Sequence, residues 1–339
     1  MRVDWIKKTK EGIQVKDGSF YVDPIYPVKT AIITHGHADH ARAGHEHVIA
    51  TLETLEIMKE RYGSNFCKKS TELKYHEKLI IEEVEIFLAP AGHVLGSAQV
   101  VMNFANQVIT VSGDYKRQDD PTCAAFEPIK SDIFITEATF ALPVFKHPNA
   151  NTQINLLIKS IQNFPERCHV IGVYSLGKAQ RLIKMLRNNG WHNTIYLHGS
   201  LVKICNLYEK FGIDLGDLEP ATIQDKPEKP HDFYKGKLIL APPSALADRW
   251  SRRFPDPILG MASGWMTVKQ RAKQRGINLP LILSDHADWN EILTTIKEVS
   301  PKEVWITHGA EEALIYECSK NNLTAKALSI IGYESDTDL

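Results

Sequence analysis

Three histidines and an aspartate fall within six residues of this sequence, in the run His35-Gly36-His37-Ala38-Asp39-His40. The chain has 14 histidines in 339 residues, so composition does not account for such a cluster, which indicates a metal-ligating motif. Imidazole nitrogen and carboxylate oxygen suit Zn²⁺, and a site without thiolates leaves Mn²⁺ open as well. Ligands packed into one short loop cannot all reach one ion with tetrahedral geometry, so the motif favours two divalent metal ions.

Further residues of metal-ligand or acid–base type follow short apolar runs elsewhere in the chain. Runs of this length, bounded by Gly, Pro or polar residues, are typical of buried strands. Loops at strand ends hold chemical groups in fixed positions, so we expect these residues to converge on one site. The runs are 30–33 before His35, 85–89 before His93, 108–111 before Asp114, 133–136 before Glu137, 281–283 before His286 and 304–307 before His308.

Two ions together require about seven to eight protein ligands once a bridging group is counted. The assignment that we favour gives His35, His37 and His93 to one ion and Asp39, His40 and His308 to the other, with Asp114 bridging both. Taken singly, His93 and Asp114 read equally well as a loop histidine and a turn aspartate. Their order in the chain, together with the other candidate ligands, favours the metal site.

The bulk composition is that of a globular protein, with 43% hydrophobic and 24% charged residues. No stretch approaches the roughly 18 apolar residues of a membrane span, and the N-terminus has no signal-peptide core, so we expect a cytoplasmic protein with no membrane association. The five cysteines form no CxxC pair, which argues against disulfides and thiolate zinc sites. A net charge of −1 does not by itself favour nucleic-acid binding.

The middle of the chain differs from its two ends. It contains helix-like stretches at 153–162, 179–188 and 201–211 and a connector rich in Pro and Lys, Asp225-Lys226-Pro227-Glu228-Lys229-Pro230, but no candidate ligands. Alternating strands and helices predict an α/β fold. We therefore expect a domain at 145–265 inserted between the two parts, 1–144 and 266–339, of a metal-binding domain.

In order, His35 to His40, His93 within Pro90-Ala91-Gly92-His93-Val94-Leu95-Gly96-Ser97, Asp114 and His308 resemble the ligand motifs of the metallo-β-lactamase superfamily. Glu137, Ser284-Asp285-His286-Ala287-Asp288 and Thr307-His308-Gly309 are similar to the extra motifs of its β-CASP nucleases. The resemblance implies an αββα sandwich with an inserted α/β β-CASP cap domain.

The resemblance extends across nearly the whole chain to the bacterial ligase-associated DNA exonucleases. The segments that carry it are Ser112-Gly113-Asp114-Tyr115-Lys116-Arg117-Gln118, Phe134-Ile135-Thr136-Glu137-Ala138-Thr139-Phe140, Gly177-Lys178-Ala179-Gln180-Arg181, Ala241-Pro242-Pro243-Ser244, Ala262-Ser263-Gly264-Trp265-Met266 and Leu283-Ser284-Asp285-His286-Ala287-Asp288-Trp289. It implies a metal-dependent 5′-to-3′ DNA exonuclease that acts in DNA end processing or repair beside an ATP-dependent DNA ligase. The expected substrate is DNA that is single-stranded or has processed ends.

Two metal ions would activate a water for attack on phosphorus and neutralise charge on the phosphate oxygens, leaving 5′-phosphate products. The resemblance implies that His286 is the general acid and that Glu137 orients it and favours its protonated form. Asp39 completes the expected catalytic set. The alternative for His286 is a buried histidine at the end of a strand.

A second anion-binding feature is the segment Tyr174-Ser175-Leu176-Gly177-Lys178, which follows an apolar run and precedes a helical pattern. It places Ser175, Gly177 and Lys178 at a helix N-terminus, a natural site for an anion. The segment resembles the one that holds a terminal 5′-phosphate in the Artemis-type DNA nucleases. Lys178 could also be an ordinary lysine at the start of a helix.

The main alternative function is an RNA-processing β-CASP ribonuclease. His308 stands where RNA-processing members of the family have histidine and Artemis-type DNA members have valine, which favours RNA at that one position. A small-molecule hydrolase of the lactamase kind would need neither the insertion nor the pair of His286 and Glu137. A non-catalytic scaffold would be expected to have lost ligands, and all seven are present.

Overall fold

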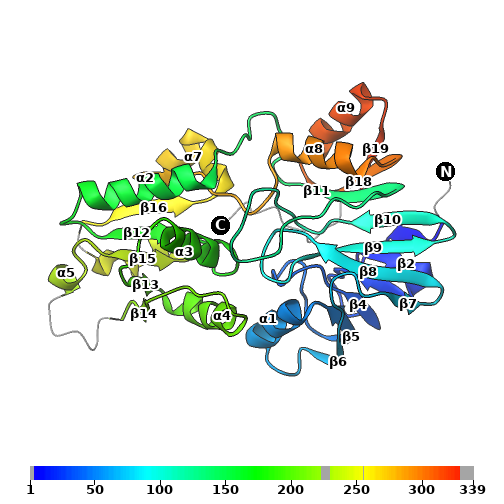
Figure 1. The fold of residues 1–339 in the computed structure, drawn as a ribbon, viewed down its shortest axis with the longest axis horizontal. Coiled ribbons are helices and arrows are strands. Elements are labelled where there is room, and N and C mark those ends of the chain that lie inside the picture. Colours follow the sequence, from blue (N-terminus) through cyan, green and yellow to red (C-terminus); the bar gives the residue numbers. More distant parts are fainter. Residues whose placement is uncertain (1–3, 223–229, 255, 329–339) are drawn as a thin grey trace. The chain divides into compact units, whose positions relative to one another are not determined.

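The computed structural model describes residues 4–222, 230–254 and 256–328 (Figure 1). The chain forms two compact units, one made of residues up to Phe145 together with those from His286, the other of Lys146–Asp285. Positions 225–229 of the predicted connector lie outside the described residues, and its last residue begins helix α5 (Pro230–Phe233). No helix in the described part of the chain is both long enough and apolar enough to cross a bilayer.

The first unit contains two sheets. In the first, the strands follow each other in chain order: β1 (Ile6–Lys8), β2 (Ile13–Val15), β3 (Phe20–Val22), β4 (Thr30–Ile32), β5 (His45–Ala50) and β6 (Cys67–Glu72). In the second, the order is β19 (Thr324–Ala327), β18 (Glu303–Gly309), β11 (Ile133–Ala138), β10 (Gln107–Val111), β9 (Ala98–Phe104), β8 (Val84–Pro90) and β7 (Leu79–Ile81). Each sheet mixes parallel and antiparallel pairs.

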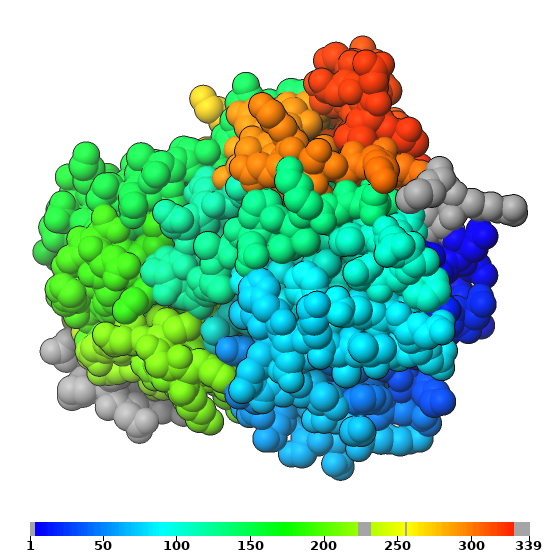
Figure 2. Space-filling view, turned by 45° about the vertical axis from the view of Figure 1, so that its right-hand side comes forward, coloured from blue at the N-terminus to red at the C-terminus, as the bar shows by residue number. Residues whose placement is uncertain are grey.

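The alternation of side chains along the strands explains the layering of this unit. Ile32 and Ile49 join the core between the two sheets, whereas their neighbours Ala31 and Val48 pack beneath helix α1 (Leu52–Tyr62). Helices α8 (Trp289–Val299) and α9 (Glu311–Lys320) cover the outer face of the second sheet. The predicted αββα sandwich is therefore confirmed. Figure 2 shows the C-terminal segment, orange to red, packed against the teal and green part of the same unit.

The second unit is built on one parallel sheet with the order β14 (Leu218–Pro220), β13 (Ile195–Leu197), β15 (Leu238–Ala241), β12 (His169–Gly172), β16 (Ile258–Ala262) and β17 (Leu279–Leu281). β12 and β15 are buried along their whole length, as expected for parallel strands covered on both faces. The helices are α2 (Ala150–Asn163), α3 (Lys178–Asn188), α4 (Gly199–Lys210), α5, α6 (Pro243–Ala247) and α7 (Lys269–Gln274).

The second unit continues to Asp285, whereas the sequence predicted its end at 265. The reason is β17, which pairs in parallel with β16 and so belongs to this sheet. Gln153 of α2 strengthens the attachment, because its side-chain oxygen accepts the backbone N–H of Ile282 at 2.9 Å. The strand predicted at 281–283 accordingly begins earlier, at Leu279. The helices predicted near 153, 179 and 201 are confirmed as α2, α3 and α4.

Candidate metal centre

The loop after β4 brings its histidines together by turning tightly. The backbone N–H of Ala41 donates to the carbonyl of His37 at 2.7 Å. Helix α1 packs closely on the loop: a Cβ added to Gly36 would lie 2.5 Å from a methyl carbon of Ile57, so only glycine fits there. Arg61, in the last turn of α1, donates to the Gly36 carbonyl at 3.1 Å and fixes the loop to the helix.

Asp114 lies at the centre of the predicted ligands. Its Oδ2 lies 3.5 Å from Nε2 of His35, 3.5 Å from Nε2 of His40 and 3.8 Å from Nε2 of His93. Its Oδ1 lies 3.6 Å from Nε2 of His308. Ligands of one tetrahedral Zn²⁺ at about 2.1 Å stand roughly 3.4 Å apart, so these separations suit ligands that share an ion.

Among the described residues, three overlapping groups of possible ligands lie in and around this cluster. His35, His37, His93 and Asp114 each offer an atom within 4.8 Å of the others, and the same holds for Asp114, Glu137 and His308 and for Asp23, His35 and His40. Asp39 joins through His40, whose Nε2 lies 3.8 Å from Asp39 Oδ2. The structure thus brings all seven sequence-predicted ligands into one cluster.

The hydrogen bonds of Thr34 determine which nitrogen of His35 faces this centre. The Thr34 hydroxyl donates its only hydrogen to Asp23 Oδ2 at 2.6 Å, because the carboxylate can only accept. The same hydroxyl oxygen lies 3.0 Å from His35 Nδ1 and must therefore accept a hydrogen from it. His35 consequently keeps its proton on Nδ1 and presents the lone pair of Nε2 to the centre.

His308 is oriented in the same way. The Thr307 hydroxyl donates to the carbonyl of Thr136 at 3.2 Å, so it accepts from His308 Nδ1 at 2.9 Å. His40 achieves this with a carboxylate, donating from Nδ1 to Asp23 Oδ2 at 2.8 Å. Three imidazoles, two from the loop after β4 and one from β18, thus have their Nδ1 occupied and their Nε2 close to Asp114.

This donor set fits divalent cations. His35 Nε2 and Asp114 Oδ1 are buried without a hydrogen-bond partner in the described part of the chain, and buried polar atoms of this kind call for a ligand. Burial holds the pKa of His35 well below its usual range and lowers that of His308 to about 4, so both are neutral ligands at pH 7. Burial raises the pKa of Asp114 to about 7. For His40, burial opposes protonation, but Asp114, Asp39 and Asp23 outweigh it and raise the pKa to about 10.

A β-bulge positions His308. β11 and β18 run in parallel register as far as the pair Thr136 and Ile306, and the next pair is Ala138 with Gly309. One residue of β11, Glu137, therefore faces two residues of β18. Gly309 is required by the same crossing: its φ is +102°, and a Cβ there would lie 2.2 Å from the backbone of Ala138.

His286 lies beside the cluster and is bound to Glu137. Its Nδ1 lies 3.0 and 2.9 Å from the two carboxylate oxygens, and Glu137 Oε1 also accepts the backbone N–H of Tyr115 at 2.9 Å. Burial alone would raise the pKa of Glu137, but the adjacent His286 outweighs burial and holds that pKa below its usual range. The ring centroid of His286 lies 4.8 Å from that of His93. This is the pairing that the sequence analysis expected.

The loop that carries His93 is braced by residues that the motifs did not indicate. The Ser97 hydroxyl accepts the backbone N–H of His93 at 3.0 Å. Lys116, buried with its charge, donates to the His93 carbonyl at 3.1 Å and to Asp120 at 2.5 Å. A paired buried cation thus holds the ligand loop in place, and loss of one partner would leave the other uncompensated.

The residues that orient the ligands were not predicted, and only some of them have a signal in the sequence. Thr34 and Thr307 each directly precede a ligand in the sequence, so a repeated Thr-His pair was the available signal. Asp23 gave none. A further His-x-His pair, His45 and His47, lies in β5, where His45 Nδ1 accepts the Val28 N–H and His47 Nε2 lies 2.8 Å from the Thr71 hydroxyl.

In the second unit, two of the predicted phosphate-binding residues, Ser175 and Gly177, lie between β12 and α3, and the third, Lys178, is the first residue of α3. The Gly177 N–H donates to Gln180 Oε1 at 2.8 Å, so that donor is already used. Lys178 is buried, with its Nζ 3.5 Å from Asp285 and 4.3 Å from the Tyr174 ring centroid. Lys178 is therefore both an anion-site candidate and part of a buried ion pair.

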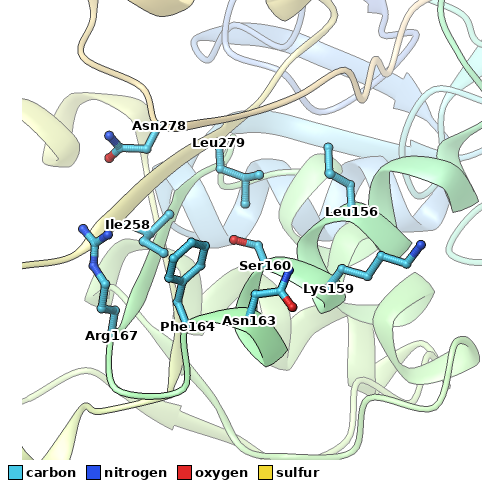
Figure 3. Close-up of a pocket in the computed structure, with 9 residues that line it drawn as sticks. All are labelled: Leu156, Lys159, Ser160, Asn163, Phe164, Arg167, Ile258, Asn278 and Leu279. Carbon is cyan, nitrogen blue, oxygen red and sulfur yellow. The ribbon is translucent and has the colours of Figure 1, made fainter.

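A groove elsewhere in the second unit has a volume of about 450 Å³ (Figure 3). It lies along the C-terminal half of α2, where Phe164 stands in the middle of the labelled side chains, and extends to the first residues of β16 and β17. None of the sequence-predicted site residues lines it.

Comparison with known proteins agrees with this description. Residues 280–319 match the family described as the Zn-dependent metallo-hydrolase RNA specificity domain. The chain is 25% identical over 337 residues to a probable DNA ligase of Opitutus terrae, and the aligned region covers 96% of this chain and 31% of that protein. It is 33% identical over 147 residues to cleavage and polyadenylation specificity factor 73 of Drosophila melanogaster, covering 41% of this chain and 21% of that one. The chain thus spans less than a third of either relative.

A solved structure shares the fold. A protein of unknown function from Enterococcus faecalis superposes with a TM-score of 0.60 over 88% of this chain and 78% of that chain. The two are 14% identical, so the likeness concerns the fold alone.

Proposed function

We propose that this chain, which belongs to the β-CASP branch of the metallo-β-lactamase superfamily, is a two-metal phosphodiesterase that degrades DNA from its 5′ end. The observation that carries this function is the cluster around Asp114 together with the His286–Glu137 pair beside it. Hydrolysis of a phosphodiester requires neutralisation of the phosphate oxygens and a proton for the leaving oxygen. The cluster around Asp114 would meet the first requirement, and the His286–Glu137 pair the second.

His35, His37 and His93 would hold one ion and Asp39, His40 and His308 the other, with Asp114 shared. Two such cations supply an activated water at neutral pH and neutralise charge that develops on phosphorus-bound oxygens. Thr34, Thr307 and Asp23 contribute by fixing the imidazoles, so that the ligand atoms need no reorganisation when substrate arrives. Zn²⁺ fits this nitrogen- and oxygen-rich set, and Mn²⁺ is the second candidate.

His286 is the proposed proton donor to the leaving 3′ oxygen. Its Nδ1 faces both Glu137 oxygens, so Nε2 is the nitrogen to which we assign the donation. Glu137 is held ionised and is itself fixed by the Tyr115 N–H, which makes it a positioning residue for the imidazole. Cleavage of the bond between phosphorus and the 3′ oxygen leaves a 3′-hydroxyl on the released nucleotide and a 5′-phosphate on the shortened strand.

DNA is supported by the extent of the likeness to the Opitutus relative. That protein is named a probable DNA ligase, and its matched region corresponds to 96% of this chain. In that relative, a region similar to this chain is therefore part of a longer protein named a probable DNA ligase. We propose that this chain prepares single-stranded or processed DNA ends for an ATP-dependent ligase.

The 5′ polarity rests on the turn containing Ser175, Gly177 and Lys178, which we propose to receive a terminal phosphate. Its support is the helix N-terminus of α3 and the adjacent ammonium group. Lys178→Met should then abolish the preference for 5′-phosphorylated over 5′-hydroxyl DNA. The control is Lys184→Met on the same helix, whose ammonium donates to the Asp214 carbonyl. Equal preference in both variants and the wild type would remove this role.

An RNA-processing nuclease is the second candidate. The observations that favour it are the match of residues 280–319 to a family described by RNA specificity and the likeness to a cleavage and polyadenylation factor. His308 falls within the matched segment and faces Asp114.

One experiment separates the two candidates. DNA and RNA strands of identical sequence, with and without a 5′-phosphate, are labelled at either end and incubated with the chain and Zn²⁺ or Mn²⁺. Mononucleotides released from the 5′ end of DNA are the expected result. Internal cuts confined to RNA would replace the DNA function with the ribonuclease.

A further inference from the structure

The connection that follows Glu137 exposes three consecutive apolar residues, Leu142, Pro143 and Val144. Leu142 is 39% exposed and Val144 58% exposed. Along the rest of the described chain, the other large exposed apolar side chains are at least eight positions apart in sequence. Single exposed apolar residues are ordinary, but a run of three on a turn, where polar residues are the rule, marks a candidate contact surface.

This turn has a fixed backbone. The Phe145 N–H donates to the Leu142 carbonyl at 2.9 Å, which closes a β-turn with Pro143 at its second position, where the ring presets the required φ. Further hydrogen bonds join Ala141 to Ala138 and Leu142 to Phe140. A rigid turn loses little conformational freedom when its side chains bind something.

Two buried aromatic residues anchor the turn beside the proposed proton donor. The rings of Phe140 and Phe145 meet edge to face at 4.9 Å, and the Phe145 carbonyl accepts the Trp289 N–H at 3.2 Å. The Phe140 ring centroid lies 6.1 Å from that of His286. The apolar turn is therefore held at a defined place next to the site where a phosphodiester would be cut.

Resting on the proposed function, we infer that Leu142, Pro143 and Val144 form an apolar wedge that contacts the bases of the DNA substrate and separates the terminal base pair of a duplex end. Apolar side chains such as Leu and Pro are the groups that proteins insert between base steps, where they replace stacking lost by the bases. Contact with base faces is independent of sequence, which suits an exonuclease that must accept every nucleotide. The wedge would extend activity from single strands to duplex ends.

The test compares a 5′-phosphorylated strand alone and the same strand in a blunt duplex. The double variant Leu142→Ser, Val144→Ser is expected to lower kcat/KM on the duplex, relative to the single strand, about ten-fold, which corresponds to about 1.4 kcal/mol. The matched control is Ile80→Ser, which removes a 68% exposed apolar side chain from β7 of the same unit, separated from β11 by three strands of the sheet. It should leave the ratio unchanged.

A binding measurement supports the kinetic one without turnover. In a His286→Ala background, 2-aminopurine placed in the terminal pair should brighten when the protein binds the duplex, and should not brighten with the double variant. An unchanged duplex-to-single-strand ratio in the double variant, or a wild-type protein that ignores duplex ends, overturns the wedge.

The proposed function is tested apart from the wedge by wild-type hydrolysis of bis(p-nitrophenyl) phosphate, which has no base pair to separate. Failure there, and on single-stranded DNA, would remove the nuclease itself.

Discussion

Asp23 accepts a hydrogen from His40 Nδ1 at 2.8 Å and, through the same carboxylate, both the N–H and the O–H of Thr34. Thr34 in turn orients His35. A single aspartate that is not itself one of the seven ligands thus fixes a ligand of each expected ion.

Asp23→Asn should therefore weaken metal binding. The amide cannot accept from His40 and from both donors of Thr34, so one ligand loses its orientation. Changes at such supporting residues typically cost about 10- to 100-fold in metal affinity or activity. Metal content after gel filtration, measured by mass spectrometry, should fall from two equivalents towards one. Asp132→Asn, at a strand end of the same unit, is the control and should keep both. Two equivalents in Asp23→Asn would contradict the role.

His286→Ala should lower kcat about 10²- to 10⁴-fold on DNA, the usual contribution of a general acid, while metal content is retained. Glu137→Gln should lower kcat less, because the imidazole remains but is poorly oriented. Both variants need a metal assay, since Glu137 lies within ligand distance of Asp114 and His308. A loss of metal in His286→Ala would make His286 a ligand instead of an acid.

Metal binding at pH 7 should release protons. The pKa of His40 is raised to about 10, so its imidazole is protonated at pH 7 in the metal-free protein and must lose that proton to become a ligand. Asp114, with a pKa of about 7, contributes a further fraction. Zn²⁺ titrations by calorimetry in buffers of different ionisation enthalpy should show about one to two protons released, with affinity rising as pH rises. A heat that is independent of the buffer would contradict this assignment.

His169 should make the second unit acid-sensitive. Burial lowers its pKa from 6.5 to about 4, so between these pH values the unfolded chain binds more protons than the folded one. The free energy of unfolding therefore falls as pH falls through this window, by about 3 kcal/mol in all.

His169→Gln, which can still bond the Ser160 hydroxyl that lies 2.9 Å from Nε2, should remove that part of the pH dependence. Urea unfolding at pH 7 and pH 4.5 measures the difference between the two proteins. The exposed His192→Gln in the same unit should behave like the wild type. The explanation fails if His169→Gln and the wild type lose the same stability between these pH values.

Local pattern predicted much of the fold and the candidate site. The strands before His35, Asp114, Glu137 and His308 are predictable because each is a short apolar run followed by a polar group, and the structure places each of these four residues at or just beyond the end of its run. The same logic applied to α2, α3 and α4, whose helical periodicity is local.

What could not be predicted depends on partners far apart in sequence. Nothing near Asp23 indicates that it faces His40, 17 positions away. The inserted unit ends at Asp285 because β17 pairs with β16. An apolar run predicts a strand, but it does not indicate which strand will be its neighbour. Lys116 was part of a recognised segment, but its place against the His93 carbonyl follows only from the packing of the two loops.

The bulge between β11 and β18 determines which face of the sheet His308, the last ligand in the sequence, points to. Along β18, Val304 and Ile306 face the helices and Trp305 faces the opposing sheet, so strict alternation would send His308 to the helix side, away from Asp114. The extra residue opposite Glu137 shifts this alternation by one position, and the His308 imidazole therefore lies on the same side as the other ligands. The spacing of this segment is thus as demanding as its composition: removal of one residue before His308 would leave every motif letter present and the second metal group incomplete.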